Sequence, residues 1–274
     1  QFLFRNIRIT ELDQPGWKPG HSHPLAQGRV TFSRPELVAR SKGFLWFPSL
    51  SRLSDGRLLA VMSNYADEHV SLSTACLSWS DDGGLTWTAP VEGRYGDPTL
   101  TLANGDELLL PYYLRPLGDG VMGEVFQLCK PGESQVHLQQ NQVIVRGWPR
   151  PDKPFTATTG MSGFVFNGDP LTDNEGNYLA NLYGHYQDAA RYALVLAASK
   201  DGVEWTIRAT IADEHCPLDG EEGPCEAALC RLPDGRLMSV FRLASNVPFG
   251  QSFSADEGRT WSAPQSMPGV FSVQ

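Results

Sequence analysis

The sequence lacks several features that would assign a protein to a class at once. None of its apolar runs approaches the ~20 residues of a membrane-spanning helix, so no membrane span is expected. It contains no Asn-x-Ser/Thr glycosylation sequon. Basic residues are in the minority, with 22 Lys and Arg against 31 Asp and Glu, and the formal net charge is −9. This charge argues against nucleic acid and against an anionic membrane surface as partners.

Cysteine is also scarce, and its spacing fits no zinc or haem site. The chain has five cysteines and no Cys-x-x-Cys pair: Cys76, Cys129, Cys216, Cys225 and Cys230. We therefore expect no metal and no cofactor. Cys216 and Cys225 flank an acidic segment, residues 217–224, and a disulfide across this segment and buried free thiols both remain open.

Helical periodicity is missing, but one unit recurs four times, and such repeats take precedence in predicting a fold. Each copy has a short apolar strand, a turn ending in Gly and a second apolar strand; the turns are Asp55-Gly56, Asn104-Gly105, Glu175-Gly176 and Asp234-Gly235. Asp-Gly and Asn-Gly between apolar runs predict tight hairpins. Repeats of ~50 to 60 residues predict an all-β propeller of four-stranded antiparallel blades, near residues 43–90, 95–150, 160–206 and 222–264.

Three copies also have a Ser-x-Asp motif after the third strand. The motifs begin at Ser80, Ser199 and Ser254 and end at Trp87, Trp205 and Trp261, and the second copy has only Lys130-Pro131-Gly132 in this place. The Ser and Asp side chains can bind nearby backbone N–H groups, a Gly takes the left-handed conformation, and the Trp packs within its blade.

These motifs, together with Trp-Phe-Pro-Ser-Leu at 46–50 and Asp-Gly-Arg-Leu-Leu at 55–59, resemble the sialidase (neuraminidase) superfamily. The likeness is greatest to the BNR-repeat "predicted neuraminidase" branch, where Ser-x-Asp is called the Asp box, and it covers residues 43–264. The resemblance implies six blades, whereas four repeats are counted in a single domain of residues 1–274. We therefore expect a fragment, or a second chain that completes the propeller. Residues 2–4 and 29–32 could also supply strands to a closing blade.

The resemblance also implies site residues. In the family a glutamate opens the strand before the hairpin and an arginine ends the returning strand, a pattern that Glu226, Asp234-Gly235 and Arg242 match. Glu226 would polarise a tyrosine nucleophile, and Arg242 would bind a substrate carboxylate through its planar fork. A structural Glu–Arg pair is the alternative. The acid/base aspartate of the family corresponds to Asp67, with Glu68 as the alternative.

Aligned on the hairpins, the four repeats place Phe47, Asp97, Asp169 and Glu226 at the start of each first strand. The same alignment places Asn64, Tyr113, His185 and Arg242 at the ends of the returning strands. We expect Asp97, Asp169, Tyr113 and His185 to line a central substrate site. Ordinary Asp-Pro turn chemistry is the alternative explanation for the two aspartates.

The sequence departs from the family in one triplet. The family opens its first blade with Arg-Ile-Pro, whereas this chain has Trp46-Phe47-Pro48. The first carboxylate-binding arginine is therefore missing, and the third, with the tyrosine nucleophile, would lie beyond Gln274. Trp46 could instead stack on the face of a sugar.

Our leading hypothesis is a secreted or extracytoplasmic sialidase-like glycoside hydrolase that cleaves a terminal, possibly acidic, sugar from a carbohydrate partner. Asp67 and Glu226 would be catalytic. A non-catalytic glycan-binding or structural propeller subunit is the first alternative. A polysaccharide lyase of the same fold, using His185 and Tyr113, is the second.

Overall fold

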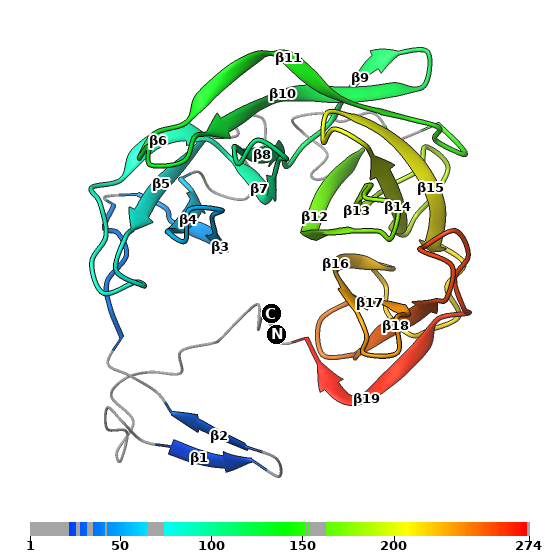
Figure 1. The fold of residues 1–274 in the computed structure, drawn as a ribbon. Coiled ribbons are helices and arrows are strands. Elements are labelled where there is room, and N and C mark those ends of the chain that lie inside the picture. Colours follow the sequence, from blue (N-terminus) through cyan, green and yellow to red (C-terminus); the bar gives the residue numbers. More distant parts are fainter. Residues whose placement is uncertain are drawn as a thin grey trace. The chain divides into compact units, whose positions relative to one another are not determined.

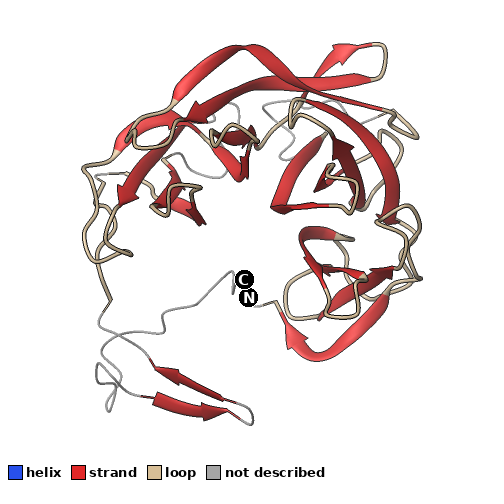
Figure 2. Cartoon of the chain, in the orientation of Figure 1, coloured by secondary structure: helices blue, strands red, loops and turns tan. Residues whose placement is uncertain are grey.

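A computed structural model describes residues 22–25, 28–31, 35–41, 43–64, 74–151, 153 and 163–272. Within these ranges the chain forms strands, turns and loops and no helix (Figure 2). No helix that could span a membrane occurs in this part of the chain. The all-β prediction is therefore confirmed for the described residues.

The chain divides into two compact units, residues 1–37 and residues 38–274. The first contains one antiparallel hairpin, β1 (Ser22–Leu25) with β2 (Gly28–Thr31). Its two strands pair only with each other among the described strands. That this segment contributes to a closing blade therefore remains a prediction.

In the second unit, the first and the last sheet have the same order. The first comprises β3 (Trp46–Arg52), β4 (Leu58–Ser63), β5 (Thr74–Ser80) and β6 (Val91–Arg94). The last comprises β16 (Cys225–Arg231), β17 (Leu237–Arg242), β18 (Pro248–Ser254) and β19 (Gln265–Phe271). Each strand pairs antiparallel with the next one in the sequence, as expected for hairpin-connected repeats.

Between them lies a sheet of nine strands that consists of two such groups. The second group comprises β7 (Gly96–Thr101), β8 (Glu107–Pro111), β10 (Val121–Cys129) and β11 (His137–Arg146), with β9 (Arg115–Gly118) added beside β10. The third comprises β12 (Phe164–Thr172), β13 (Tyr178–Gly184), β14 (Ala193–Ser199) and β15 (Glu204–Ala212). A short parallel pairing of β11 with β15 joins the two groups at their outer strands.

The four groups repeat in atomic detail at their first hairpin. In each, the same two backbone hydrogen bonds close the turn, such as Leu232 N to Arg236 O and Gly235 N to Leu232 O. The glycine φ angles agree closely: 88° at Gly56, Gly105 and Gly235, and 84° at Gly176. Such angles suit glycine because it has no Cβ. The hairpins predicted from these four turns are therefore confirmed.

The three Ser-x-Asp turns are also alike. Ser80, Ser199 and Ser254 each end the third strand of their group. In each turn the serine Oγ contacts the aspartate and the aspartate accepts backbone N–H groups. The indole Nε1 of Trp87, Trp205 and Trp261 donates to the carbonyl of a turn glycine at 2.8–3.2 Å. The predicted equivalence of the three tryptophans is therefore confirmed.

The hydrophobic core lies between successive groups. One cluster joins the first and second groups around Leu59, Trp79 and Leu109. A second joins the second and third groups around Leu108, Phe166 and Trp205. A third joins the third and fourth groups around Leu194, Leu229 and Phe241. Each group therefore depends on its neighbour for the burial of its apolar face.

The first strands of neighbouring groups contact one another: β3 with β7, β7 with β12, and β12 with β16. These strands follow the inner side of residues 38–274 (Figure 1). The five cysteines, all in described residues, are free thiols. The alternative of a disulfide between Cys216 and Cys225 is therefore not what the structure contains.

Candidate functional site

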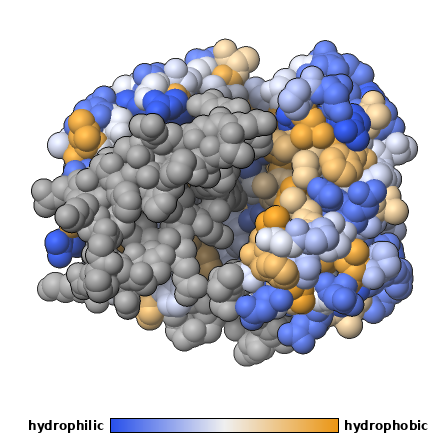
Figure 3. Space-filling view, turned by 90° about the horizontal axis from the view of Figure 1, so that it is seen from below, coloured by the Kyte–Doolittle hydropathy of each residue, from blue (hydrophilic) through white to orange (hydrophobic). Residues whose placement is uncertain are grey.

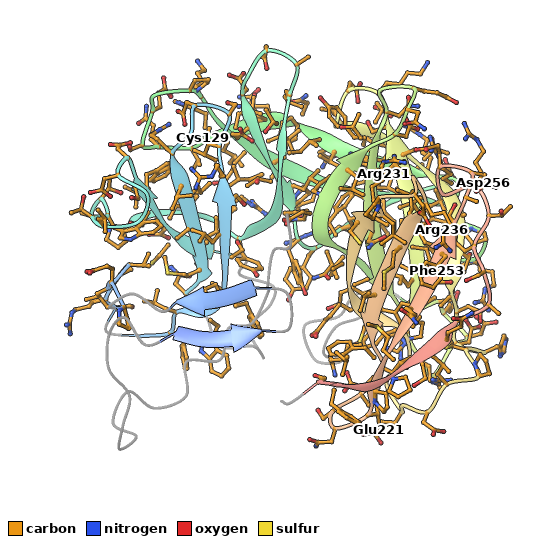
Figure 4. The ribbon with its side chains drawn as sticks, turned by 60° about the horizontal axis from the view of Figure 1, so that its bottom comes forward. Cys129, Glu221, Arg231, Arg236, Phe253 and Asp256 are labelled. Carbon is orange, nitrogen blue, oxygen red and sulfur yellow. The ribbon has the colours of Figure 1, made fainter. Side chains whose placement is uncertain are left out.

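The two ends of each group carry different features. The hairpin turns and the Ser-x-Asp turns lie at one end, because both follow strands that run in the same direction. The first strands begin, and the returning strands finish, at the other end. Figure 4 shows this in the fourth group, where Glu221 lies at the end opposite Arg231, Arg236 and Asp256. The predicted site residues belong to the end of Glu221.

A β-bulge interrupts every first strand at this end. Its extra residues lie between Trp46 and Ser49, Gly96 and Thr99, Asn167 and Leu171, and Cys225 and Ala228. Phe47, Asp97, Asp169 and Glu226 all fall inside these bulges, so the alignment of the first strands is confirmed. Bulges are known to redirect side chains beside functional sites.

Two bulge residues also adopt a backbone conformation that costs free energy. Phe47 has φ 47° and Glu226 has φ 45°, values in the left-handed region that non-glycine residues rarely adopt. In the third group Gly168, with φ 80°, is an additional residue of the bulge. A Cβ at Gly168 would lie 2.4 Å from the carbonyl oxygen of Ala227. The backbones of β12 and β16 therefore approach closely beside Glu226.

The alignment of the returning strands was wrong in register. Arg242 pairs with Cys225, just before the fourth bulge. The residues that pair just before the other three bulges are Ser63, Pro111 and Asn181. Asn64, Tyr113 and His185 follow them by one, two and four residues, because the strand ends differ in length. Sequence spacing from the hairpin did not reveal this.

The most ordered charged cluster at this end contains Arg242 and two glutamates. Arg242 Nε donates to Glu226 Oε2 at 2.7 Å, and its Nη2 donates to Glu226 Oε1 at 3.3 Å. The predicted contact between Glu226 and Arg242 is therefore confirmed. Nη1 and Nη2 of Arg242 also donate to the two oxygens of Glu222, at 2.6 and 2.7 Å. Burial by itself lowers the pKa of Arg242, but these hydrogen bonds raise it above its ordinary value.

Glu222 was missed in the sequence. Its signal was the acidic segment between Cys216 and Cys225, which was interpreted only as a loop. The backbone holds Glu222 in place, since its N–H donates to Leu243 O and its carbonyl accepts from Tyr192 N. The loop is therefore a fixed part of the site.

Tyrosines surround this cluster. The hydroxyls of Tyr112 and Tyr183 lie 3.1 Å apart, and the ring of Tyr183 contacts that of Tyr192 edge-on. Burial raises the pKa of both Tyr112 and Tyr183 well above its ordinary value, and the charge of Glu226 raises both further. These two phenols are therefore protonated hydrogen-bonding groups at neutral pH.

Two predicted substrate-binding residues belong to the same aromatic neighbourhood. The ring of His185 lies 4.1 Å from that of Tyr192, and burial, with the charge of Lys153, lowers the pKa of His185. The ring of Tyr113 contacts Tyr112 edge-on. The structure thus connects His185 and Tyr113 to the surroundings of Glu226 through Tyr192 and Tyr112.

The other predicted residues are less closely connected to the cluster. Trp46 is 43% exposed, and its ring lies 5.8 Å from those of Phe44 and of Phe47. Asp169 is half-buried in its bulge. Asp67 and Glu68 lie outside the described residues, as does the side chain of Asp97.

The described residues line two hollows of different size. One, of about 10 Å³, lies beside Tyr95, Tyr112 and Tyr113 and has room for about one water molecule. The other, of about 300 Å³, is lined by Arg150, Tyr186 and His215 among others and contains none of the predicted site residues. In this part of the chain no group of three His, Cys, Asp or Glu side chains is arranged to hold a metal ion.

No known protein family and no curated protein sequence matches the chain. Its fold does match solved structures. A protein of unknown function from Dyadobacter fermentans is 21% identical, with a TM-score of 0.60, over 85% of this chain and 72% of that one. An α-L-arabinanase from Penicillium chrysogenum, complexed with arabinobiose, is 16% identical, with a TM-score of 0.52, over 84% and 69%.

The NanB sialidase from Streptococcus pneumoniae is 15% identical, with a TM-score of 0.54. The match covers 88% of this chain but 55% of that sialidase. These likenesses define the class of the fold: it is that of the β-propeller glycoside hydrolases, which include sialidases and arabinanases. At such identities they show the fold alone.

Proposed function

We propose that residues 38–274 form part of a sialidase-like β-propeller, with the four groups as its blades, and that this propeller is a glycoside hydrolase acting on a terminal sugar. The observation that carries the proposal is the cluster of Glu222, Glu226 and Arg242 at the bulged end of the strands. Glycosidases commonly use paired carboxylates, one of which stabilises the positive charge that develops on the sugar. The fold neighbours named as an arabinanase and a sialidase support this class of chemistry.

In this proposal Glu226 is the carboxylate closest to the reacting sugar. Its left-handed φ and its hydrogen bonds to Arg242 hold the carboxylate in one orientation, and such preorganisation favours catalysis. Tyr112 and Tyr183 supply neutral hydroxyls that exclude water and bind sugar oxygens. Asp67 is the proposed acid that protonates the leaving oxygen.

The test is turnover on a panel of aryl glycosides that covers neutral and acidic sugars. Glu226→Gln should lower kcat by ~10² or more, because an amide cannot stabilise the developing charge. Asp67→Asn should lower kcat similarly while leaving the Kd of a bound sugar nearly unchanged. Glu221→Gln, in an exposed neighbour of Glu222, is the matched control and should retain full activity.

Melting temperatures separate chemistry from folding. If Glu226→Gln loses activity and keeps its melting temperature, the catalytic role is supported. If the unaltered protein binds sugars but cleaves none of the panel, it is a glycan-binding propeller, and the proposal fails.

A further inference from the structure

The guanidinium of Arg242 has both of its bidentate edges occupied by the protein's own carboxylates. The Nη1–Nη2 edge binds Glu222, and the Nε–Nη2 edge binds Glu226. These two edges are the ones through which an arginine holds a carboxylate of a ligand. A substrate carboxylate would have to displace one of the two glutamates.

The exposure of the three side chains points in the same direction. The side chain of Arg242 is 8% exposed, whereas those of Glu222 and Glu226 are 32% and 36% exposed. A ligand arriving from solvent therefore meets carboxylate oxygens before it meets the guanidinium. Carboxylates accept hydrogen bonds and donate none, so they bind hydroxyl groups and repel another carboxylate.

The surroundings do not offset this preference. The cluster has two carboxylates and one guanidinium, so it carries one excess negative charge, and Glu221 is exposed in the same loop. The groups that the charge of Glu222 reaches include Tyr192, a neutral phenol whose pKa is raised to about 12, mainly by burial. At neutral pH Tyr192 contributes a hydroxyl and no positive charge.

We infer that Glu222 determines specificity: it makes the site selective for uncharged, hydroxyl-rich sugars and against sugars that carry a carboxylate. This inference rests on the proposed function, because it assumes that a sugar binds at Glu226. It names the role of one further residue, since Arg242 by itself would favour an acidic sugar. Glu222 occupies the donors that an acidic sugar would need.

The experiment measures Kd values for matched pairs of ligands with the full chain. Methyl glucoside and methyl galactoside are each compared with the corresponding methyl uronide, which differs only by the carboxylate at C6. For the unaltered protein, at least one neutral sugar should bind ~10-fold or more tightly than its uronide, as expected when one charge-assisted contact is lost and replaced by repulsion.

Replacement of Glu222 should reverse the preference. Glu222→Ala frees the Nη1–Nη2 edge of Arg242, so the uronides should gain ~10-fold or more in affinity, while the neutral sugars change less. The backbone bonds of Glu222 to Leu243 and Tyr192 persist in this variant. Glu222→Gln, which keeps the shape of the side chain, provides a second variant if Glu222→Ala does not fold. Glu221→Ala is the matched control and should leave both classes of ligand unaffected.

The outcomes separate the two proposals. If the unaltered protein binds uronides more tightly than neutral sugars, the inference about Glu222 is overturned and the proposed function stands. If folded Glu222 variants gain no affinity for uronides, Glu222 does not determine specificity. If the protein binds neither class, the proposed function itself fails.

Discussion

Asp173 differs from its counterparts in the other hairpins, which have leucine at the same position: Leu53, Leu102 and Leu232. Its carboxylate accepts hydrogen bonds from the backbone and the side chain of Asn177 and from Arg208 Nη1. Burial by itself would raise the pKa of Asp173, but these bonds lower it to about 2. The side chain is fully buried, so Asp173 has replaced an apolar contact with a charged network.

We predict that Asp173→Ala destabilises the protein by about 3 kcal/mol, because it leaves the largely buried Arg208 without its ion-pair partner. The folded pKa of about 2 lies below the ordinary 3.8. The contribution of Asp173 is therefore complete above about pH 4 and is lost as the pH falls through about 2. Urea unfolding at about pH 7 and at about pH 2.5 measures both effects.

Asp234→Ala is the control, since Asp234 is an exposed hairpin acid that pairs with Arg236. Its effect on unfolding should be much smaller, as is usual for surface ion pairs. Equal losses in the two variants would show that the turn, and not the buried network, stabilises the third hairpin.

At the scale of the elements, the bulges and the hairpins make different demands on glycine. Gly176 has φ 84° and open space where a Cβ would lie, whereas Gly168 has φ 80° and faces the Ala227 carbonyl. The first position requires only a left-handed backbone. The second also requires the absence of a side chain, because β12 and β16 approach each other there.

We therefore predict that Gly176→Ala costs about 1 kcal/mol, for backbone strain alone. Gly168→Ala should cost about 3 kcal/mol, because a steric clash is added to the strain. Gly168→Ala should also weaken sugar binding, since the clash displaces the residue next to Glu226. Denaturant unfolding and Kd measurements on both variants check this, and equal costs would show that the strands can separate freely.

At the scale of the whole molecule, residues 38–274 are held together by apolar clusters between groups and, among the described cysteines, by no disulfide. Hydrophobic and hydrophilic residues alternate over the described part of the face in Figure 3. Burial raises the pKa of the thiols of Cys129, Cys216 and Cys225. Cys230 is exposed.

A thiol reagent should therefore react with Cys230 before Cys225 in the native protein, and with all five cysteines after unfolding. The melting temperature should not change when a reductant is added. Fewer than five reactive thiols in the unfolded, unreduced protein would reveal a disulfide and contradict the free-thiol state.

Local sequence patterns predicted the hairpins and the Ser-x-Asp turns well. A tight turn depends on a few neighbouring residues, such as Asp234 and Gly235, so its conformation can be inferred from the sequence. The contact between Glu226 and Arg242 was predictable for a similar reason, because both residues flank one hairpin. The roles assigned to Asp67, Asp97, Asp169, Tyr113, His185 and Trp46 remain predictions.

By itself, the sequence determined the all-β class, the four repeats and the pairing of successive strands, because these follow from turn chemistry and apolar pattern within each repeat. Only the tertiary structure decided which residues share the site. The register of the returning strands, the approach of β12 to β16 and the position of Glu222 depend on strand-end lengths and on packing between groups. Glu222 lies 20 residues before Arg242, and only the folded loop brings its carboxylate onto the guanidinium.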